Sequence, residues 1–524
     1  MARHAGVILP LFSAVSTSSW GIGELSDLAS LSPWLAAGGF DRLMLLPLGT
    51  VPDGETSPYS AMSAMAIDPI YIAIYRLEDL SLAAGPAVFP EDAVLDVQTA
   101  RGGARIQYAI VRRAKLRALT LAFDRFLAEE WERFTTRAAA LAAYIARERW
   151  WLDDYALYRA LAETLPDSWR KWPDPLRDRD ARALDDVRRQ LGREVLRHQY
   201  WQWIAESQWQ EARAVARSHG VTVFGDLPFV VGTDSADVWS RPHEFRLDVS
   251  TGVPPDAFSD TGQDWGLPLY RWDVIADGGF VWIRQRARRM AALFDGFRVD
   301  HLVGFYRTYG RPAEGEPFFS PADEPAQTRQ GEQVLTIFRD AGAEILAEDL
   351  GVVPDFVRAS LGCLGVPGCK VLRWERDWHA PGAPFLDPAR YAPVSVTLTG
   401  THDTETLAAW WDGASPAERT AALDLPWFRE RGLTDPSEAW TESLRDAFLA
   451  LAYHAGSDHL FFPVQDLFGW PDRINTPATV TDANWTWRLP WPVDRLREEP
   501  AATERARFCR ALARASGRGC RDGT

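Results

Sequence analysis

The chain has 524 residues, of which 46% are hydrophobic and 25% charged, a balance typical of a soluble globular protein with a large core. It carries 57 Lys and Arg against 72 Asp and Glu, which gives a net charge of −15 at pH 7. An acidic chain of this kind lacks the positive field that nucleic-acid phosphates require, so we expect no nucleic-acid partner.

The N-terminal residues 1–19, MARHAGVILPLFSAVSTSS, combine one arginine, a short apolar run and small residues, as a secretory signal does. Pro10 interrupts the run and no clear cleavage site follows, so we expect no secretion. No run of about 20 apolar residues is present, so no membrane span is expected.

The chain has four cysteines: Cys363, Cys369, Cys509 and Cys520. Their spacing matches no zinc or redox motif, and four in a chain of this length do not form a disulfide scaffold. Reduced thiols fit the cytoplasm best, so we expect a cytoplasmic location.

Several short segments rich in branched residues end in polar or acidic residues. They are 43–49, 221–228, 294–301, 343–351, 370–375, 394–403 and 459–466. Near-continuous apolar runs are typical of parallel strands that are buried on both faces, and helical patterns lie between them, as at 281–294 and 331–343. Polar residues at the C-terminal end of strand after strand predict an α/β fold, a (β/α)8 TIM barrel whose chemistry gathers at that end.

Insertions into the barrel are expected at three places. Residues from about 100 to 215 are rich in Ala, Arg, Leu, Glu and Trp at helical spacing, and predict a helical insertion subdomain. The stretches at about 228–280 and 305–330 are expected to be loop insertions over the barrel mouth. We therefore expect a single catalytic barrel over residues 1–524.

The segment FDGFRVDH, residues 294–301, places two charges within a predicted buried strand. Side chains alternate along a strand, so Arg298 and Asp300 share the face toward the barrel mouth. Phe297 and Val299 share the opposite face and are expected to pack under the helices. In this position Arg298 can keep Asp300 ionised and oriented.

Four acids end four of the predicted strands: Asp226, Asp300, Glu348 and Asp403. Two carboxyl groups that flank a sugar ring are the minimum apparatus for glycosidic chemistry, one as acid and base, the other as nucleophile or base. Any single one of these acids could instead be a helix cap or a loop ion pair. The recurrence at four strand ends, with an arginine in phase, favours a catalytic group.

A metal site is the competing interpretation of the same segments. His301 beside Asp300, and His402 beside Asp403, offer nitrogen and oxygen ligands. Adjacent residues on a strand face opposite ways, however, and the spacing lacks a paired-histidine signature. We therefore expect no required metal and no organic cofactor.

Longer motifs accompany these acids along the chain. They are GIGELSDLASLSPWLAAGG with LMLLPLG, SPYSAMSAMAIDPIYI (57–72), FGDLPFVVGTDSADVW (224–239), PPDAFSDTGQDWGLPLYRW (254–272), GFRVDH, AEDLG, GTHDT and QDLFGWPDRINTPATVTDANWTWRL (465–489). Together they cover almost the whole length and resemble the 4-alpha-glucanotransferases of the amylomaltase, or disproportionating enzyme, family (glycoside hydrolase family 77-like).

The resemblance implies a role for each matching residue. Asp300 is similar to the family's nucleophile, Glu348 to its general acid and base, and Asp403 to the third carboxylate, which stabilises the transition state. The residues that match the family's other substrate-binding positions are Arg298, His402, Asp226, Ser57, Tyr59, Asp256, Gln263, Trp265 and Asn475. The implied reaction is retaining transfer of α-1,4-glucan segments between maltooligosaccharides, on a barrel without the C-terminal β-domain of many α-amylases.

Three other functions remain open at this point: a retaining α-glucan hydrolase with the same acids, a non-catalytic glucan-binding protein, and a metal-dependent barrel hydrolase. The intact acids argue against the second. The chain also departs from the family, with Ala257 where many members have an aromatic residue and with LVGFYRTYG after His301. These departures leave acceptor preference and product size open, and the sequence does not give the oligomeric state.

Overall fold

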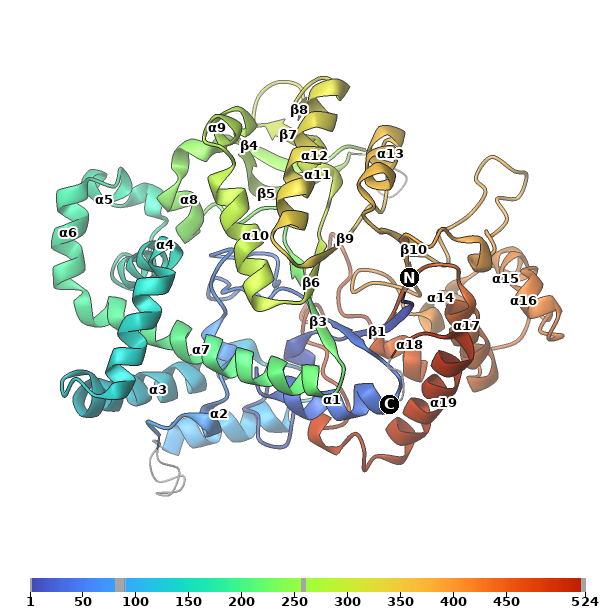
Figure 1. The fold of residues 1–524 in the computed structure, drawn as a ribbon, viewed down its shortest axis with the longest axis horizontal. Helices are drawn as coiled ribbons and strands as arrows, with labels where there is room; N and C mark the ends of the chain where they lie inside the picture. The colour runs from blue at the N-terminus through green and yellow to red at the C-terminus, as the bar shows by residue number, and fades with distance from the viewer. Residues whose placement is uncertain (1, 81–88, 90, 256–260, 520–524) are drawn as a thin grey trace.

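The computed structural model describes residues 2–80, 89, 91–255 and 261–519. Eight parallel strands close into a barrel in the order β1-β12-β11-β10-β9-β6-β3-β2 (Figure 1). The barrel strands are β1 (His4–Ile8), β2 (Arg42–Met44), β3 (Thr222–Leu227), β6 (Gly296–Val299), β9 (Glu344–Ala347), β10 (Gly368–Val371), β11 (Ser395–Leu398) and β12 (His459–Pro463). The predicted (β/α)8 fold is thus confirmed.

The first barrel strand, β1, comes from the signal-like N-terminal run rather than from a predicted strand. It pairs in parallel with β12 on one side and β2 on the other. Gly6 lets the strands pack closely there, because a Cβ at this position would lie 2.5 Å from the Phe461 ring. The other seven barrel strands coincide with or overlap the predicted segments.

Helices surround the barrel and cover its outer face (Figure 1). They are α1 (Asp27–Ala37), α10 (Val281–Leu293), α12 (Glu324–Asp340), α13 (Asp355–Leu364), α14 (Leu407–Gly413), α17 (Glu442–His454), α18 (Val464–Phe468) and α19 (Pro500–Ser516). The short helices α15 (Pro416–Leu423) and α16 (Pro426–Arg429) lie farther out and pack with α14 and α17 in a separate apolar cluster. Phe297 of β6 is fully buried and meets Phe338 of α12 edge to face at 6.0 Å. Apolar side chains such as Phe224, Leu346 and Phe461 fill the barrel interior.

Between β2 and β3 the chain is mainly helical and lies to one side of the barrel (Figure 1). Its helices are α2 (Glu91–Gly102), α3 (Tyr108–Phe126), α4 (Thr136–Thr164), α5 (Asp174–Arg177), α6 (Ala181–Gln190) and α7 (Gly192–Ser218). A fully buried ion pair joins Lys115 of α3 to Glu24, just before α1, at 2.7 Å. The interpretation of this segment as a subdomain stays a proposal.

A second, antiparallel sheet has the order β5-β4-β7-β8. Its strands are β4 (Phe245–Val253), β5 (Gln263–Tyr270), β7 (Thr308–Pro312) and β8 (Phe318–Ser320), and the short helices α8 (Ala236–Ser240), α9 (Trp272–Asp277) and α11 (Val303–Tyr306) lie nearby in the sequence. The two stretches expected as loops therefore contain strands. These strands could not be recognised from the sequence because their alternation of apolar and polar residues is broken. The pairing of β4 with β5 contains register shifts, and both strands have interior Gly or Pro residues.

Membrane-spanning helices were searched for in the described ranges. None of the helices there is both long and apolar enough to cross a bilayer.

Candidate active site

The four acids predicted from strand ends lie together at the C-terminal end of the barrel, which also agrees with the general rule for this fold. Asp226 belongs to β3, Asp300 follows β6, and Glu348 follows β9. Asp403 lies in the turn after β11. Asp300, Glu348 and Asp403 line one open cleft of about 1110 Å³, whereas the side chain of Asp226 is 1% exposed.

Strand register brings Asp300 next to Glu348. In the parallel pair of β6 and β9, Val299 is opposite Ala347, so the residues that follow leave the barrel side by side. The Glu348 N–H donates to the Val299 carbonyl at 3.1 Å, and the Asp300 N–H donates to the Leu227 carbonyl of β3 at 3.1 Å. Both carboxyl groups are thus carried by backbone that is tied to neighbouring strands.

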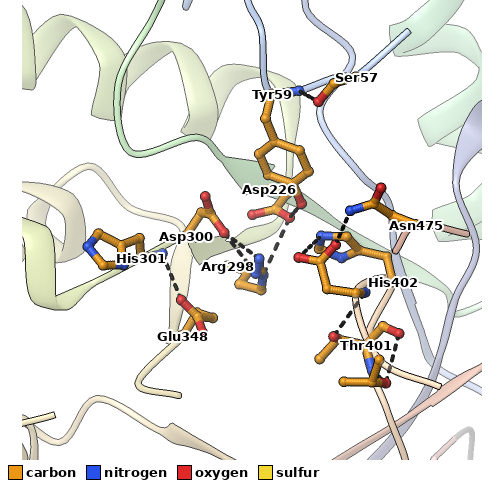
Figure 2. Close-up of polar contacts among 12 residues, drawn as sticks. Ser57, Tyr59, Asp226, Arg298, Asp300, His301, Glu348, Thr401, His402 and Asn475 are labelled. Carbon is orange, nitrogen blue, oxygen red and sulfur yellow. Dashed lines mark hydrogen bonds and ion pairs between the residues drawn. The ribbon is translucent and has the colours of Figure 1, made fainter. Parts of the chain in front are cut away.

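Arg298 connects two of the acids, as Figure 2 shows. Its guanidinium donates to Asp300 Oδ1 from Nη1 at 3.2 Å and also from Nη2, and its Nε donates to Asp226 Oδ2 at 3.4 Å. Arg298 and Asp300 therefore point to the same side of the strand, as the alternation of side chains predicts. With a side chain only 9% exposed, Arg298 is a buried cation with two carboxylate partners.

Opposing electrostatic effects act on the pKa of Asp300. Burial raises the pKa of Asp300 to about 6, while the Arg298 charge acts in the opposite direction and the Asp226 charge adds to the rise. Arg298 thus limits the effect of burial without cancelling it. A pKa near 6 leaves Asp300 mainly ionised at pH 7, the state that a nucleophile requires.

Glu348 has the higher affinity for a proton of the two. Burial raises the pKa of Glu348 to about 8, helped by the charges of Asp300 and Asp349 and opposed by Arg298. Its Oε2 accepts the backbone N–H of His301 at 2.8 Å, which favours the ionised form but does not outweigh burial. Glu348 is therefore mainly protonated at pH 7, as a general acid must be.

The pKa of Asp403 is shifted in the opposite direction, below its ordinary value. Its Oδ2 is 3.2 Å from His402 Nε2, and its Oδ1 accepts a hydrogen bond from Asn475 Nδ2 at 2.6 Å. Burial acts to raise the pKa of Asp403, but the His402 charge and these two hydrogen bonds lower it to about 2. Arg473 fixes the arrangement, donating to the carbonyl oxygens of Asp403 at 2.8 Å and of Asn475 at 3.2 Å.

Tyr59 forms a wall of the cleft together with two other rings. Its hydroxyl donates to Asp226 Oδ2 at 2.6 Å, and its ring stacks on His402 at 5.3 Å and lies 5.8 Å from Trp485. The Ser57 hydroxyl accepts the Tyr59 N–H at 3.4 Å, which shapes the loop that carries both residues (Figure 2). Asp226 thus accepts hydrogen bonds from both Tyr59 and Arg298 and orients their side chains.

The predicted residues on the antiparallel sheet also reach the cleft. Gln263 and Trp265 of β5 both line it, and Trp265 Nε1 donates to Gln263 Oε1 at 3.2 Å. The Trp265 ring meets His301 edge to face at 4.7 Å. Asp256, the remaining predicted contact, lies outside the described residues, as does the departure at Ala257.

The two histidines considered as metal ligands have other roles. His301 packs edge-on against Trp265 and Phe229, and burial lowers its pKa to about 4. His402 pairs with Asp403. Within the described part of the chain, no group of three or more His, Cys, Asp or Glu side chains is arranged to hold a metal ion.

Sequence reasoning missed several residues that line the cleft. They include Val352, Arg358, Lys370, Trp374, Trp378, Glu405 and Trp485. Trp374 lies near the end of the predicted segment 370–375 and Trp485 lies in the NWTW segment, so position and motif could have indicated both. Trp378 had no local signal beyond the high tryptophan content of the chain.

Comparison with known proteins adds to this geometry. Residues 9–494 match the profile of glycoside hydrolase family 77, which is described as 4-alpha-glucanotransferase. The chain belongs to this 4-alpha-glucanotransferase family. The predicted resemblance and the predicted enzyme class are therefore both confirmed.

Curated relatives in the 4-alpha-glucanotransferase family match over nearly their whole lengths. The enzyme of Thermus thermophilus is 35% identical over 521 residues, covering 93% of this chain and 96% of that protein. The enzyme of Chlamydia pneumoniae is 31% identical over 500 residues, covering 92% and 91%. Among solved structures, the amylomaltase of Streptococcus agalactiae in complex with acarbose has a TM-score of 0.82 at 25% identity, covering 99% of this chain and 100% of that one.

Proposed function

We propose that this enzyme transfers α-1,4-glucan segments between maltooligosaccharides by a retaining double displacement. Asp300 is the nucleophile, Glu348 the general acid and base, and Asp403 the carboxylate that stabilises the transition state. One observation carries the proposal: Asp300 and Glu348 leave adjacent strands side by side into the same cleft, and burial raises the pKa of Glu348 further than that of Asp300. Two carboxyl groups with separated pKa values are what such chemistry needs.

In the first step an Asp300 carboxylate oxygen attacks C1 of the donor glucose. The bond from C1 to the glycosidic O4 breaks, and the electron pair leaves with O4, which receives the Glu348 proton. The product is a glycosyl ester on Asp300, and the shortened glucan departs with a free 4-hydroxyl. Glu348 is left as a carboxylate, now stabilised by the His301 N–H at Oε2.

In the second step the ionised Glu348 removes the proton from the 4-hydroxyl of an acceptor glucan. That oxygen attacks C1, the ester bond to Asp300 breaks, and Asp300 returns to its carboxylate form beside Arg298. Two inversions at C1 give net retention of configuration. Asp403, held ionised by His402 and Asn475, provides negative charge near the oxocarbenium-like transition state.

The remaining contacts in the cleft support binding of the sugar. Tyr59 and His402 offer a stacked aromatic surface, and Gln263 and Trp265 offer a polar group and a second ring on the opposite wall. These groups are suited to α-1,4-glucans, which combine apolar ring faces with many hydroxyls. A cytoplasmic location, inferred from the number and spacing of the cysteines, remains part of this proposal.

The product profile from maltotriose tests the proposed reaction. Free glucose, longer oligosaccharides and total reducing ends are followed together over time. Glucose with a ladder of longer products, at constant reducing ends, is the expected result. Rising reducing ends without longer products would instead identify a hydrolase, and a folded protein without any turnover would favour a glucan-binding role.

The neighbour Asp349 offers a test of the acid assigned above. Its Oδ1 accepts the Cys369 N–H at 2.6 Å, a contact that an asparagine carbonyl can keep, and its charge helps to raise the pKa of Glu348. Asp349→Asn is expected to move the basic limb of the kcat/KM profile to lower pH. Activity at the optimum should stay within about tenfold of wild type.

The matched control for this variant is Asp340→Asn at the end of α12, where the side chain is 66% exposed. It removes the same charge from the surface and should leave the pH profile in place. A basic limb that does not move in Asp349→Asn, or that moves equally in both variants, contradicts the assignment of that limb to Glu348.

Chelation tests the expectation that no metal is required. Dialysis against EDTA is expected to leave the rate of transfer from maltotriose unchanged, because the proposed steps use only Asp300, Glu348 and Asp403. The measurement is the initial rate before dialysis, after dialysis and after return of single divalent ions. Loss of activity that one of these ions restores would overturn the expectation.

A further inference from the structure

Two exposed tryptophans line the same cleft as the acids. Trp374 is 36% exposed and Trp378 is 68% exposed, and no other tryptophan in the described ranges reaches this exposure. Both lie in the segment 372–394, which connects β10 to β11. Exposed tryptophan carries a large apolar surface into water, and surfaces of this kind commonly mark a binding site.

The segment that carries Trp378 is anchored rather than loose. The Arg376 guanidinium lies 3.9 Å from the Phe385 ring centroid and 5.7 Å from the Trp378 ring, and it pairs with Glu418 of α15. Across the base of the loop, the Asp377 N–H donates to the Pro384 carbonyl at 2.9 Å. Trp378 is therefore held at the surface by its neighbours, with its ring largely free.

The strand order explains why this segment reaches the active site. β10 lies between β9, which carries Glu348 at its end, and β11, which precedes Asp403. The loop after β10 thus leaves the barrel between the proposed acid and the third carboxylate. Trp374 and Trp378 line the same cleft as Glu348 and Asp403, so the surface is continuous with the site of reaction.

An α-1,4-glucan chain matches this surface in chemistry. The C–H face of a glucose ring is apolar and packs on an indole, while its hydroxyls bond to the polar groups at the ring's edge. Arg373, Glu375 and Arg376 line the cleft near the two rings and supply such groups. Protein interfaces usually contain a wider apolar core than two separate rings in a polar cleft. This surface therefore fits a glucan better than a protein partner.

We propose that Trp378, together with Trp374, forms a distal subsite that binds glucose units of long α-1,4-glucans beyond the units held at the acids. This inference rests on the proposed function and extends it to chain length. Short substrates that fill only the subsites at the acids do not reach Trp378. Long maltooligosaccharides gain additional affinity from it.

The test compares maltotriose with maltoheptaose in four proteins: wild type, Trp378→Ala, Trp378→Phe and Phe134→Ala. Phe134 is 91% exposed and precedes α4 in the helical segment. The variant Phe134→Ala therefore removes an exposed ring away from the cleft and serves as the matched control. Trp378→Ala is expected to raise KM for maltoheptaose about tenfold, as loss of one stacking contact does, and to change KM for maltotriose by less than about twofold. Phe134→Ala should change neither, and Trp378→Phe should restore most of the affinity for maltoheptaose.

Calorimetric affinities separate failure of this inference from failure of the proposed function, because they can be measured in the Asp300→Asn background, which is expected to bind glucan without turnover. If wild type binds and transfers maltoheptaose but Trp378→Ala binds it equally well, the subsite is refuted and the transferase is not. Equal losses for maltotriose and maltoheptaose would also refute it, since the residue would then act at the acids. A wild-type protein that neither binds nor transfers either glucan would overturn both.

Discussion

Asp300→Asn is expected to reduce transfer from maltotriose by at least about 10⁴-fold, a loss typical of removing a covalent nucleophile. The amide has nearly the same shape but cannot attack C1, so no glycosyl ester forms. Arg298 keeps its contact with Asp226 when Asp300 loses its charge, which preserves the packing at the strand end. The expected result is thus an inactive but folded enzyme.

Stability measurements are expected to show that the loss is chemical and not a loss of fold. The pKa of Asp300 is raised from an ordinary 3.8 to about 6, so the folded state binds a proton more tightly than the unfolded chain. The ionised carboxylate therefore destabilises the fold increasingly as pH rises from about 4 to 6. Asp300→Asn should melt at or above the wild-type temperature at pH 7, and near the same temperature at pH 4. Near-normal turnover in the purified variant would refute the assignment of Asp300.

Much of the barrel could be predicted because buried parallel strands leave a simple trace in sequence. The strand β3 is mainly apolar and carries Asp226 near its end, and the acids Asp300 and Glu348 directly follow β6 and β9. The strand β1 was missed since its five residues follow a charged N-terminus and resemble a signal. The sheet of β4 and β5 was missed because bulges and Gly and Pro residues interrupt its alternation.

The meeting of Asp300, Glu348 and Asp403 could also be predicted, since parallel strand ends gather at one rim. The contact between Arg298 and Asp300 followed from alternation along a single strand. Other features depend on the whole fold. Trp485, whose ring lies 5.8 Å from that of Tyr59, has a backbone φ of 62°, a conformation that sequence does not reveal in a tryptophan.

The protonation order of the two acids is another property of the assembled fold. The Arg298 charge opposes the rise in pKa of both Asp300 and Glu348, yet burial and surrounding carboxylates raise the pKa of Glu348 further. The charges involved come from β3, β6 and the ends of β9, which are far apart in the chain. The sequence could name the candidates, but their roles follow only from the charges that surround each one.

Glu348→Gln is expected to reduce transfer from maltotriose by at least about 10³-fold. The variant should still form the glycosyl ester from a donor whose leaving group needs no proton. The 4-oxygen of a glucan leaves poorly without the Glu348 proton. In α-maltosyl fluoride the leaving group is fluoride, which departs without protonation. Asp300 can then still attack C1, so the C1–F bond breaks and the maltosyl ester forms.

The second step distinguishes Glu348 from a residue that only supports the fold. Without the carboxylate, no base removes the proton from an acceptor hydroxyl, and the ester on Asp300 should accumulate. Mass spectrometry is expected to show the protein heavier by one maltosyl unit, with the mass on the peptide that contains Asp300. Azide needs no deprotonation, so its addition should release α-maltosyl azide and restore turnover.

The pH dependence gives the final control for Glu348. Wild-type kcat/KM for maltotriose should fall above pH 8, where Glu348, with a pKa of about 8, loses its proton. Azide-supported turnover of the fluoride by Glu348→Gln should lack this limb, because no acid is required. The folded-state pKa of Glu348 is about 8, above the ordinary 4.5, so its ionisation destabilises the wild type as pH rises from about 4.5 to 8. The melting temperature of Glu348→Gln should therefore exceed that of the wild type by more at pH 9 than at pH 5. An unchanged basic limb in the variant would assign the acid to another residue.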